Sequence, residues 1–141
     1  MTVGQYDAKN LIVTAAGIRI EGFGDGDFIS YDPPELFTSV VGSDGLVARA
    51  ANNDFRVEVT ITLLATSPAN DSLDAISRAD INNPNGSGVF AFTMSDLFGR
   101  FSAAAPECWI KKRPAVTFGR EVGSREWVIE CAKFTDKVYG S

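Results

Sequence analysis

The clearest pattern in the chain is a regular alternation of apolar and polar residues over positions 55–64. A period of two predicts a long β-strand with one buried side and one solvent-facing side. The apolar positions, which we expect to hold the core, are Phe55, Val57, Val59, Ile61 and Leu63. The polar positions, which we expect on the wet side, are Arg56, Glu58, Thr60 and Thr62. A polar face of this composition is better suited to a structural surface than to a catalytic site.

Shorter strand-like runs, bounded by turn residues, occur along the rest of the chain. Residues 11–14 and 18–23 predict a hairpin. Residues 46–50 predict a second hairpin, paired with 55–64 through the Asn-Asn-Asp turn at 52–54. The remaining strands are predicted at 28–31, 89–94, 101–112 with a break or bulge at Pro106, 116–118 and 126–134.

One helix is predicted, from about Pro68 to about Asp80. Ser67 is a good N-cap, Pro68 suits the first helical position, and Asp71 lies in the first turn, where the helix dipole favours negative charge. Many strands with one helix and glycine-rich turns predict a mainly β fold. We expect two packed antiparallel sheets, as a sandwich or a partly closed barrel, with the helix at 68–80 on one side. A chain of 141 residues is expected to form a single domain, 1–141.

A long connection at 32–45 is apolar without a clear period. Its large apolar residues are Leu36, Phe37, Val40 and Val41. One interpretation is that this loop folds back over the core. The other is that it reaches a neighbouring copy of the protein, because such a cluster is unusual unless something covers it.

The amino-acid composition argues against several classes of function. The net charge is −5 and the 13 Lys and Arg are scattered, which disfavours gripping of nucleic acid. There is no histidine, the usual general base, and the two cysteines, Cys108 and Cys131, are expected to be buried free thiols. No apolar stretch approaches the ~20 residues of a membrane-spanning helix. We therefore predict no metal site, cofactor or membrane insertion. The missing histidine does not exclude catalysis by carboxylates alone, but we predict no catalytic residue and no enzymatic activity.

Three motifs could carry chemistry, and each has a simpler interpretation. Asp25-Gly26-Asp27 lacks the other oxygen ligands of a calcium loop, and residues 85–88 lack the Gly-Lys-Ser/Thr of a phosphate loop, so both are interpreted as turns. Glu121 and Glu126 near Trp127 could be a carboxylate pair with a sugar platform. The simpler interpretation is two solvated carboxylates and a core tryptophan.

Taken in order, several runs make the chain resemble the inner tail-tube proteins of long-tailed bacteriophages, those with contractile tails and the related R-type tailocins above all. The runs are residues 24–28 (GDGDF), 41–45 (VGSDG), 60–68 (TITLLATSP) with Asn70-Asp71, 108–112 (CWIKK), 118–121 (FGRE) and 125–127 (REW). The resemblance spans about residues 7–138, nearly the whole chain.

This resemblance implies a β-sandwich shared with the type VI secretion tube protein, in a virion protein that is assembled in the host cytoplasm. It implies hexameric rings that stack into a hollow tail tube, which houses the tape measure, conducts DNA and is enclosed by the sheath. Baseplate and tail terminator proteins would be further partners, and no catalytic residues carry over.

Under this resemblance the connection at 32–45 would be an inter-subunit arm. The polar side of the strand predicted at 55–64 would face either the lumen of the tube or a neighbouring subunit. The alternatives are a single-ring tail terminator or baseplate adaptor, a monomeric β-sandwich module that binds a ligand such as carbohydrate, and a hydrolase without histidine.

Overall fold

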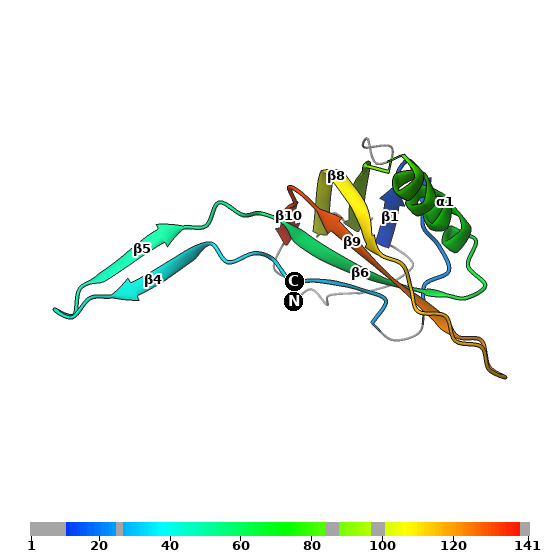
Figure 1. Ribbon diagram of the computed structural model, residues 1–141, viewed down its shortest axis with the longest axis horizontal. Helices are drawn as coiled ribbons and strands as arrows, with labels where there is room; N and C mark the ends of the chain where they lie inside the picture. The colour runs from blue at the N-terminus through cyan, green and yellow to red at the C-terminus, as the bar shows by residue number, and fades with distance from the viewer. Residues whose placement is uncertain (1–10, 25–26, 84–87, 97–100, 139–141) are drawn as a thin grey trace, which may run out of the picture.

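The computed structural model describes residues 11–24, 27–83, 88–96 and 101–138, and most of its elements are strands (Figure 1). The strands are β1 (Leu11–Ala15), β2 (Ile18–Arg19), β3 (Ile29–Tyr31), β4 (Phe37–Val41), β5 (Val47–Ala51), β6 (Val57–Leu64), β7 (Phe90–Asp96), β8 (Phe101–Lys112), β9 (Ser124–Cys131) and β10 (Thr135–Val138). The one helix in these ranges is α1 (Ala69–Asn82).

Eight strands form one antiparallel sheet in the order β2-β1-β7-β8-β9-β6-β3, with β10 also paired to β8. The other two, β4 and β5, form a separate two-stranded antiparallel sheet. The predicted class, mainly β with two antiparallel sheets and one helix, is confirmed. Over the described residues the sheets do not close into a barrel. The second sheet projects from the first instead of stacking on it (Figure 1).

One face of the large sheet carries the core, and β6 supplies its centre. Val57, Val59, Ile61 and Leu63 are at most 2% exposed, as the alternation predicts. Burial of each such side chain contributes about 1.5–3 kcal/mol. Phe55, which was also expected in the core, is 43% exposed. That expectation is wrong because β6 begins at Val57, and the chain leaves the sheet before it.

The helix is fixed to the sheet at its first turn. It begins at Ala69, one residue after the predicted start, and the Ala69 N–H donates to Ser67 Oγ at 3.2 Å. Ser67 in turn donates to the carbonyl of Glu21, so the helix start is tied to the chain that follows β2. The Trp127 indole N–H on β9 donates to Asn70 Oδ1 at 2.9 Å, and Leu73 is buried in the core.

Gly22 lies beside this helix start and has a φ of +78°. A Cβ at this position would lie 2.7 Å from the Ser67 Cβ. The backbone conformation and the lack of space both require glycine here.

The predicted irregularity at Pro106 is confirmed. Pro106 has no N–H to donate to a neighbouring strand. The β7–β8 register shifts by one residue between Phe90 and Phe92, which is a β-bulge. The other edge of β8 pairs with β9 over one part of its length and with β10 over another. The strand predicted at 126–134 is therefore divided into two strands. The register stays constant across this division, from Cys108↔Cys131 to Ala104↔Thr135.

Two strand predictions are wrong. Residues 46–50 do not pair with β6, because β9 and β3 already occupy its two edges, and β5 pairs with β4 instead. Residues 116–118 are not a strand, because they lie in the β8–β9 connection with no strand beside them. The candidate motif Asp25-Gly26-Asp27 and residues 85–88 lie partly outside the described residues, as does the turn expected near 96–100.

Candidate assembly surfaces

The arm, which we define as residues 36–51, is the hairpin of β4 and β5 that projects from the body (Figure 1). Every residue of both strands is exposed. The structure brings the four predicted arm residues together on this hairpin, and it does not fold them back over the core. The large exposed side chains are Leu36, Phe37, Val40, Val41, Leu46 and Val47, with exposures from 48% at Phe37 to 71% at Leu46.

The arm is closed at its base and at its tip, but these contacts bury little. At the base, the Asn52 N–H donates to the Leu36 carbonyl at 2.9 Å, and its side-chain amide donates to the Glu35 carbonyl at 2.6 Å. Along the hairpin, the Arg49 guanidinium lies 4.3 Å from the centre of the Phe37 ring. An isolated two-stranded hairpin is only marginally stable in water. Within the described part of the chain, no other element covers the arm.

Both faces of the arm are mainly apolar. One face carries Phe37, Ser39, Val41, Val47, Arg49 and Ala51, and the other carries Thr38, Val40, Ala48 and Ala50. Arg49 is the single charged residue on the two strands. Apolar residues on both faces are typical of strands that are covered on both sides.

The predicted wet side of β6 lies on the sheet face opposite the core. Glu58 is exposed, while Thr60 and Thr62 are half-buried. Thr60 lies opposite Val128 of β9, and Thr62 lies opposite Glu126. Three of the predicted residues therefore share one face of β6, and Arg56 lies just before the strand.

Ion pairs connect this face across three strands. Arg56 contacts Asp54 at 2.8 Å and Glu130 at 3.6 Å, and Lys111 on β8 pairs with Glu58 on β6. Hydrogen bonds from Arg56 lower the pKa of the Asp54 carboxyl from 3.8 to about 2. The sequence did not predict these partners, because β8, β9 and β6 are neighbours only in the folded sheet.

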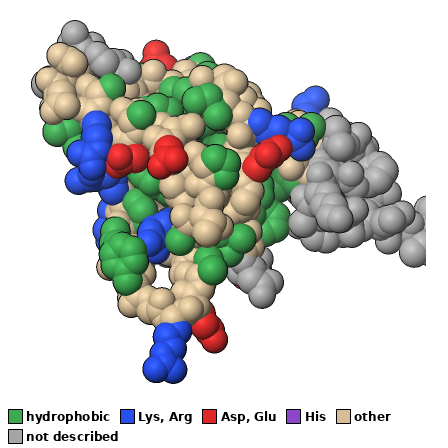
Figure 2. All heavy atoms as spheres, turned by 90° about the vertical axis from the view of Figure 1, so that its right-hand side faces the viewer, with side chains coloured by type: hydrophobic (Ala, Val, Ile, Leu, Met, Phe, Trp, Pro, Cys, Tyr) green, Lys and Arg blue, Asp and Glu red, His purple; other side chains and the backbone are tan. Residues whose placement is uncertain are grey.

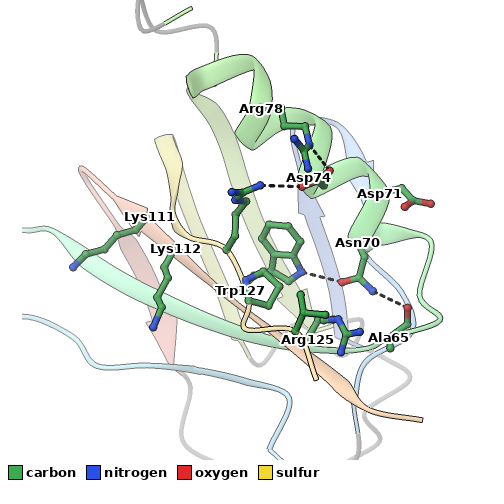
Figure 3. Close-up of a pocket in the computed structure, with 12 residues that line it drawn as sticks. Ala65, Asn70, Asp71, Asp74, Arg78, Lys111, Lys112, Arg125 and Trp127 are labelled. Atoms are coloured by element: carbon green, nitrogen blue, oxygen red, sulfur yellow. Dashed lines mark hydrogen bonds and ion pairs between the residues drawn. The ribbon is translucent and has the colours of Figure 1, made fainter. Parts of the chain in front are cut away.

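A groove of about 720 Å³ lies between α1 and the end of β8 (Figure 3). Within it Asp74 accepts a hydrogen bond from Arg78 at 2.8 Å and lies 3.7 Å from Arg113. Trp127 lines the groove but is only 3% exposed, and its indole N–H donates a hydrogen bond to Asn70. The interpretation of Trp127 as an open sugar platform is wrong, and the core interpretation is confirmed.

A second apolar projection lies in the β8–β9 connection, residues 113–123. Val116, Phe118 and Val122 are exposed there, and Phe118 is 87% exposed. This connection extends from the end of the molecule opposite the arm (Figure 1). Figure 2 faces that end and shows hydrophobic side chains open to solvent among charged ones.

Both projections present apolar side chains to solvent. In the described part of the chain no helix is long and apolar enough to cross a membrane. Nowhere in the described ranges do three or more His, Cys, Asp or Glu side chains gather as a metal site would require. What the geometry offers is contact surface.

The described residues combine an open antiparallel sheet, one helix and two exposed apolar projections. No family model matches the chain. It is similar to Structural protein ORF10 of Pseudomonas phage KPP10, with 28% identity over 124 residues, which cover 86% of this chain and 72% of the relative.

Solved structures share the fold. A chain of the anti-feeding prophage cap, the AFP tube-terminating cap, aligns with a TM-score of 0.62 and 12% identity over 98% of this chain and 95% of that chain. A chain of the PVC sheath/tube terminator, from an extracellular contractile injection system, aligns with a TM-score of 0.62 and 12% identity. The alignment covers 98% of this chain and 100% of that chain. A chain of the PVC sheath–tube complex aligns with a TM-score of 0.60 and 12% identity, over 95% of this chain and 92% of that chain. The chain is thus similar in sequence to a structural protein of a phage, and it shares its fold with chains of contractile injection systems.

Proposed function

We propose that this chain is a ring-forming structural subunit of a phage tail, located at the tail tube of the virion. The observation that carries the proposal is the arm, an exposed hairpin that is apolar on both faces. Copies of one chain that contact each other head to tail close into a ring when the rotation between them closes. In such a ring the arm of one subunit would lie between surfaces of its neighbours.

Two further features support a ring. The large sheet ends in the short strands β2 and β3, and in the described part of the chain no further strand pairs with their outer edges, where another chain could add a strand. The polar face of β6 suits a water-filled channel, and the net charge of −5 would not hold DNA back. A hexameric ring, passage of DNA and contact with tape measure, sheath and baseplate proteins belong to this proposal.

The proposal has two versions. The first is a single ring that terminates the tube, and it is favoured because two of the solved structures with this fold are of a tube-terminating cap and a sheath/tube terminator. The second is a stacked tube subunit. It is favoured by the fold similarity to a chain of a sheath–tube complex.

Negative-stain electron microscopy of the purified protein separates these versions. Single rings that never stack support the terminator, and hollow tubes support the tube subunit. A protein that stays monomeric in size-exclusion chromatography at high concentration contradicts both versions and supports a monomeric binding module.

The arm is tested by a double substitution, Val40→Asp with Val47→Asp. Both side chains are exposed, at 70% and 68%, so the fold should persist while rings or tubes disappear. Ile81→Asp on α1 is the matched control, because Ile81 is 64% exposed but lies outside the arm. Rings that persist in the double variant would show that the arm does not make the contact.

A further inference from the structure

The two cysteines of this chain lie side by side in the core. Cys108 on β8 is directly opposite Cys131 on β9, and both are 0% exposed. Their sulfur atoms are 3.0 Å apart, and both are free thiols. No other cysteine occurs in the sequence, so all the thiol chemistry of the chain is concentrated at this one cross-strand pair.

The hydrogen bonding around the pair brings the two side chains close. The Ala132 N–H donates to the Glu107 carbonyl at 3.0 Å, which makes 107 and 132 a hydrogen-bonded pair. Such pairs alternate with non-hydrogen-bonded ones, so Cys108 and Cys131 form the latter kind, in which the Cα atoms approach to about 4.5 Å. Disulfides span Cα separations of about 4.4–6.8 Å, so the backbone already suits one.

We propose that Cys108 and Cys131 are a site of oxidative modification, at which a small peroxide closes a disulfide between β8 and β9. The sulfur atoms need to approach by only about 1 Å to reach a bonding distance near 2.05 Å. The strands keep their register because the cysteines are already directly opposed. In a reducing medium the pair stays as two packed thiols.

The two thiols are not equivalent. Cys108 donates its S–H to Cys131, and this hydrogen bond raises the pKa of Cys108 and lowers the pKa of Cys131. Cys131 ends β9, next to residues 132–134, where the strand is interrupted before β10. We therefore assign the first attack to Cys131, whose thiolate would be the reactive form. A local opening at this interruption would admit a molecule as small as hydrogen peroxide.

The step balances with hydrogen peroxide as the oxidant. Cys131 loses its proton, and its thiolate attacks one peroxide oxygen as the O–O bond breaks. The hydroxide that leaves takes up that proton to form the first water, and Cys131 becomes a sulfenic acid. Cys108 then attacks the Cys131 sulfur. The S–S bond forms, the S–O bond breaks, and a water molecule carries away the oxygen with the Cys108 proton. Overall two thiols and one peroxide give one disulfide and two waters.

The product would close a covalent loop around the β8–β9 connection. The two cysteines are 23 positions apart, and the loop between them carries the exposed Val116, Phe118 and Val122. A cross-link at its base reduces the conformational freedom of the unfolded chain. The oxidised protein should therefore unfold at a higher temperature than the reduced one.

Mass spectrometry of the folded wild-type protein tests the proposal. The reduced protein is treated with hydrogen peroxide, then denatured and exposed to an alkylating reagent. The expected product is a monomer that is about 2 Da lighter and carries no alkyl group, and dithiothreitol should restore both thiols. Two alkylated cysteines, oxygen adducts without a disulfide, or a disulfide between two chains would each overturn the proposal.

Cys108→Ala is the control, because it removes the resolving thiol and keeps the proposed nucleophile. After peroxide treatment it should react with dimedone at Cys131 and show no loss of 2 Da and no change in melting temperature. The wild-type experiment decides the proposal even if this variant fails to fold. A melting temperature of the wild type that peroxide leaves unchanged would also count against the cross-link.

Discussion

Strand β6 and the arm are built from similar residues and have opposite surroundings. Val59 on β6 is 0% exposed, whereas Val40 on the arm is 70% exposed. The first is covered by the chain itself, with β9 and β3 on its two edges. Among the described residues, the second lies on a strand whose single paired neighbour is the other strand of the hairpin. The comparison indicates that the body carries most of the folding free energy of the monomer, while the arm contributes little to it.

The largest expected effect comes from a matched pair of leucines. Leu63→Ala in β6 should lower the free energy of unfolding by about 2–5 kcal/mol, because Leu63 is fully buried and leaves a cavity. Leu46→Ala at the arm should change it by less than about 0.5 kcal/mol, because Leu46 is 71% exposed. Urea unfolding of the monomer, followed by circular dichroism, measures both. Equal losses would contradict the division between body and arm.

A smaller difference is expected for two glycines with the same backbone conformation. Gly22 has a φ of +78° and Gly45, in the turn of the arm, has +82°. Alanine in this region costs ~1–2 kcal/mol of strain. At Gly22 the new Cβ also meets Ser67, so Gly22→Ala should lower the midpoint of thermal unfolding. At Gly45 no atom lies within 4 Å, and the strain should stay within the arm. A larger loss for Gly45→Ala would mean that the arm contributes to the stability of the body.

The smallest effect concerns Asp54, which lies where the arm joins β6. Because Arg56 lowers its pKa from 3.8 to about 2, its contribution to stability is present above pH 4 and is lost as the pH falls towards 2. The group is fully exposed, so the change in stability should be slight. Carboxyl resonances in an NMR titration should give a midpoint near 2. The variant Arg56→Gln should return that midpoint towards 3.8, and an unchanged midpoint would exclude Arg56 as the cause.

The sequence predicted the parts of the fold that depend on local chemistry. Alternation located β6, Ser67 and Pro68 located the start of α1 to within one residue, and Pro106 located the bulge. It did not predict the pairing of β5 with β4. Strand pairing is usually inferred from a buried face, and the arm buries neither of its faces in its own chain.

The candidate site was predicted in part for the same reason. The apolar composition of 32–45 identified Leu36, Phe37, Val40 and Val41 as unusual, and the structure brings them together on the arm. The second half of the arm, with Leu46 and Val47, and the exposed Phe118 were missed. Both segments were predicted as short strands, at 46–50 and 116–118, and only the three-dimensional structure shows that these side chains are exposed.

The place where the arm leaves the body has an evolutionary consequence. β3 and β6 are paired neighbours, with Tyr31 opposite Val59, so residues 32–56 begin and end at one point of the sheet. The two ends of this insertion are held together whatever its length, and lengthening a loop between fixed ends costs little. The arm can therefore be shortened, extended or exchanged without moving the core. Related chains could change the neighbour they grip while they keep the same fold.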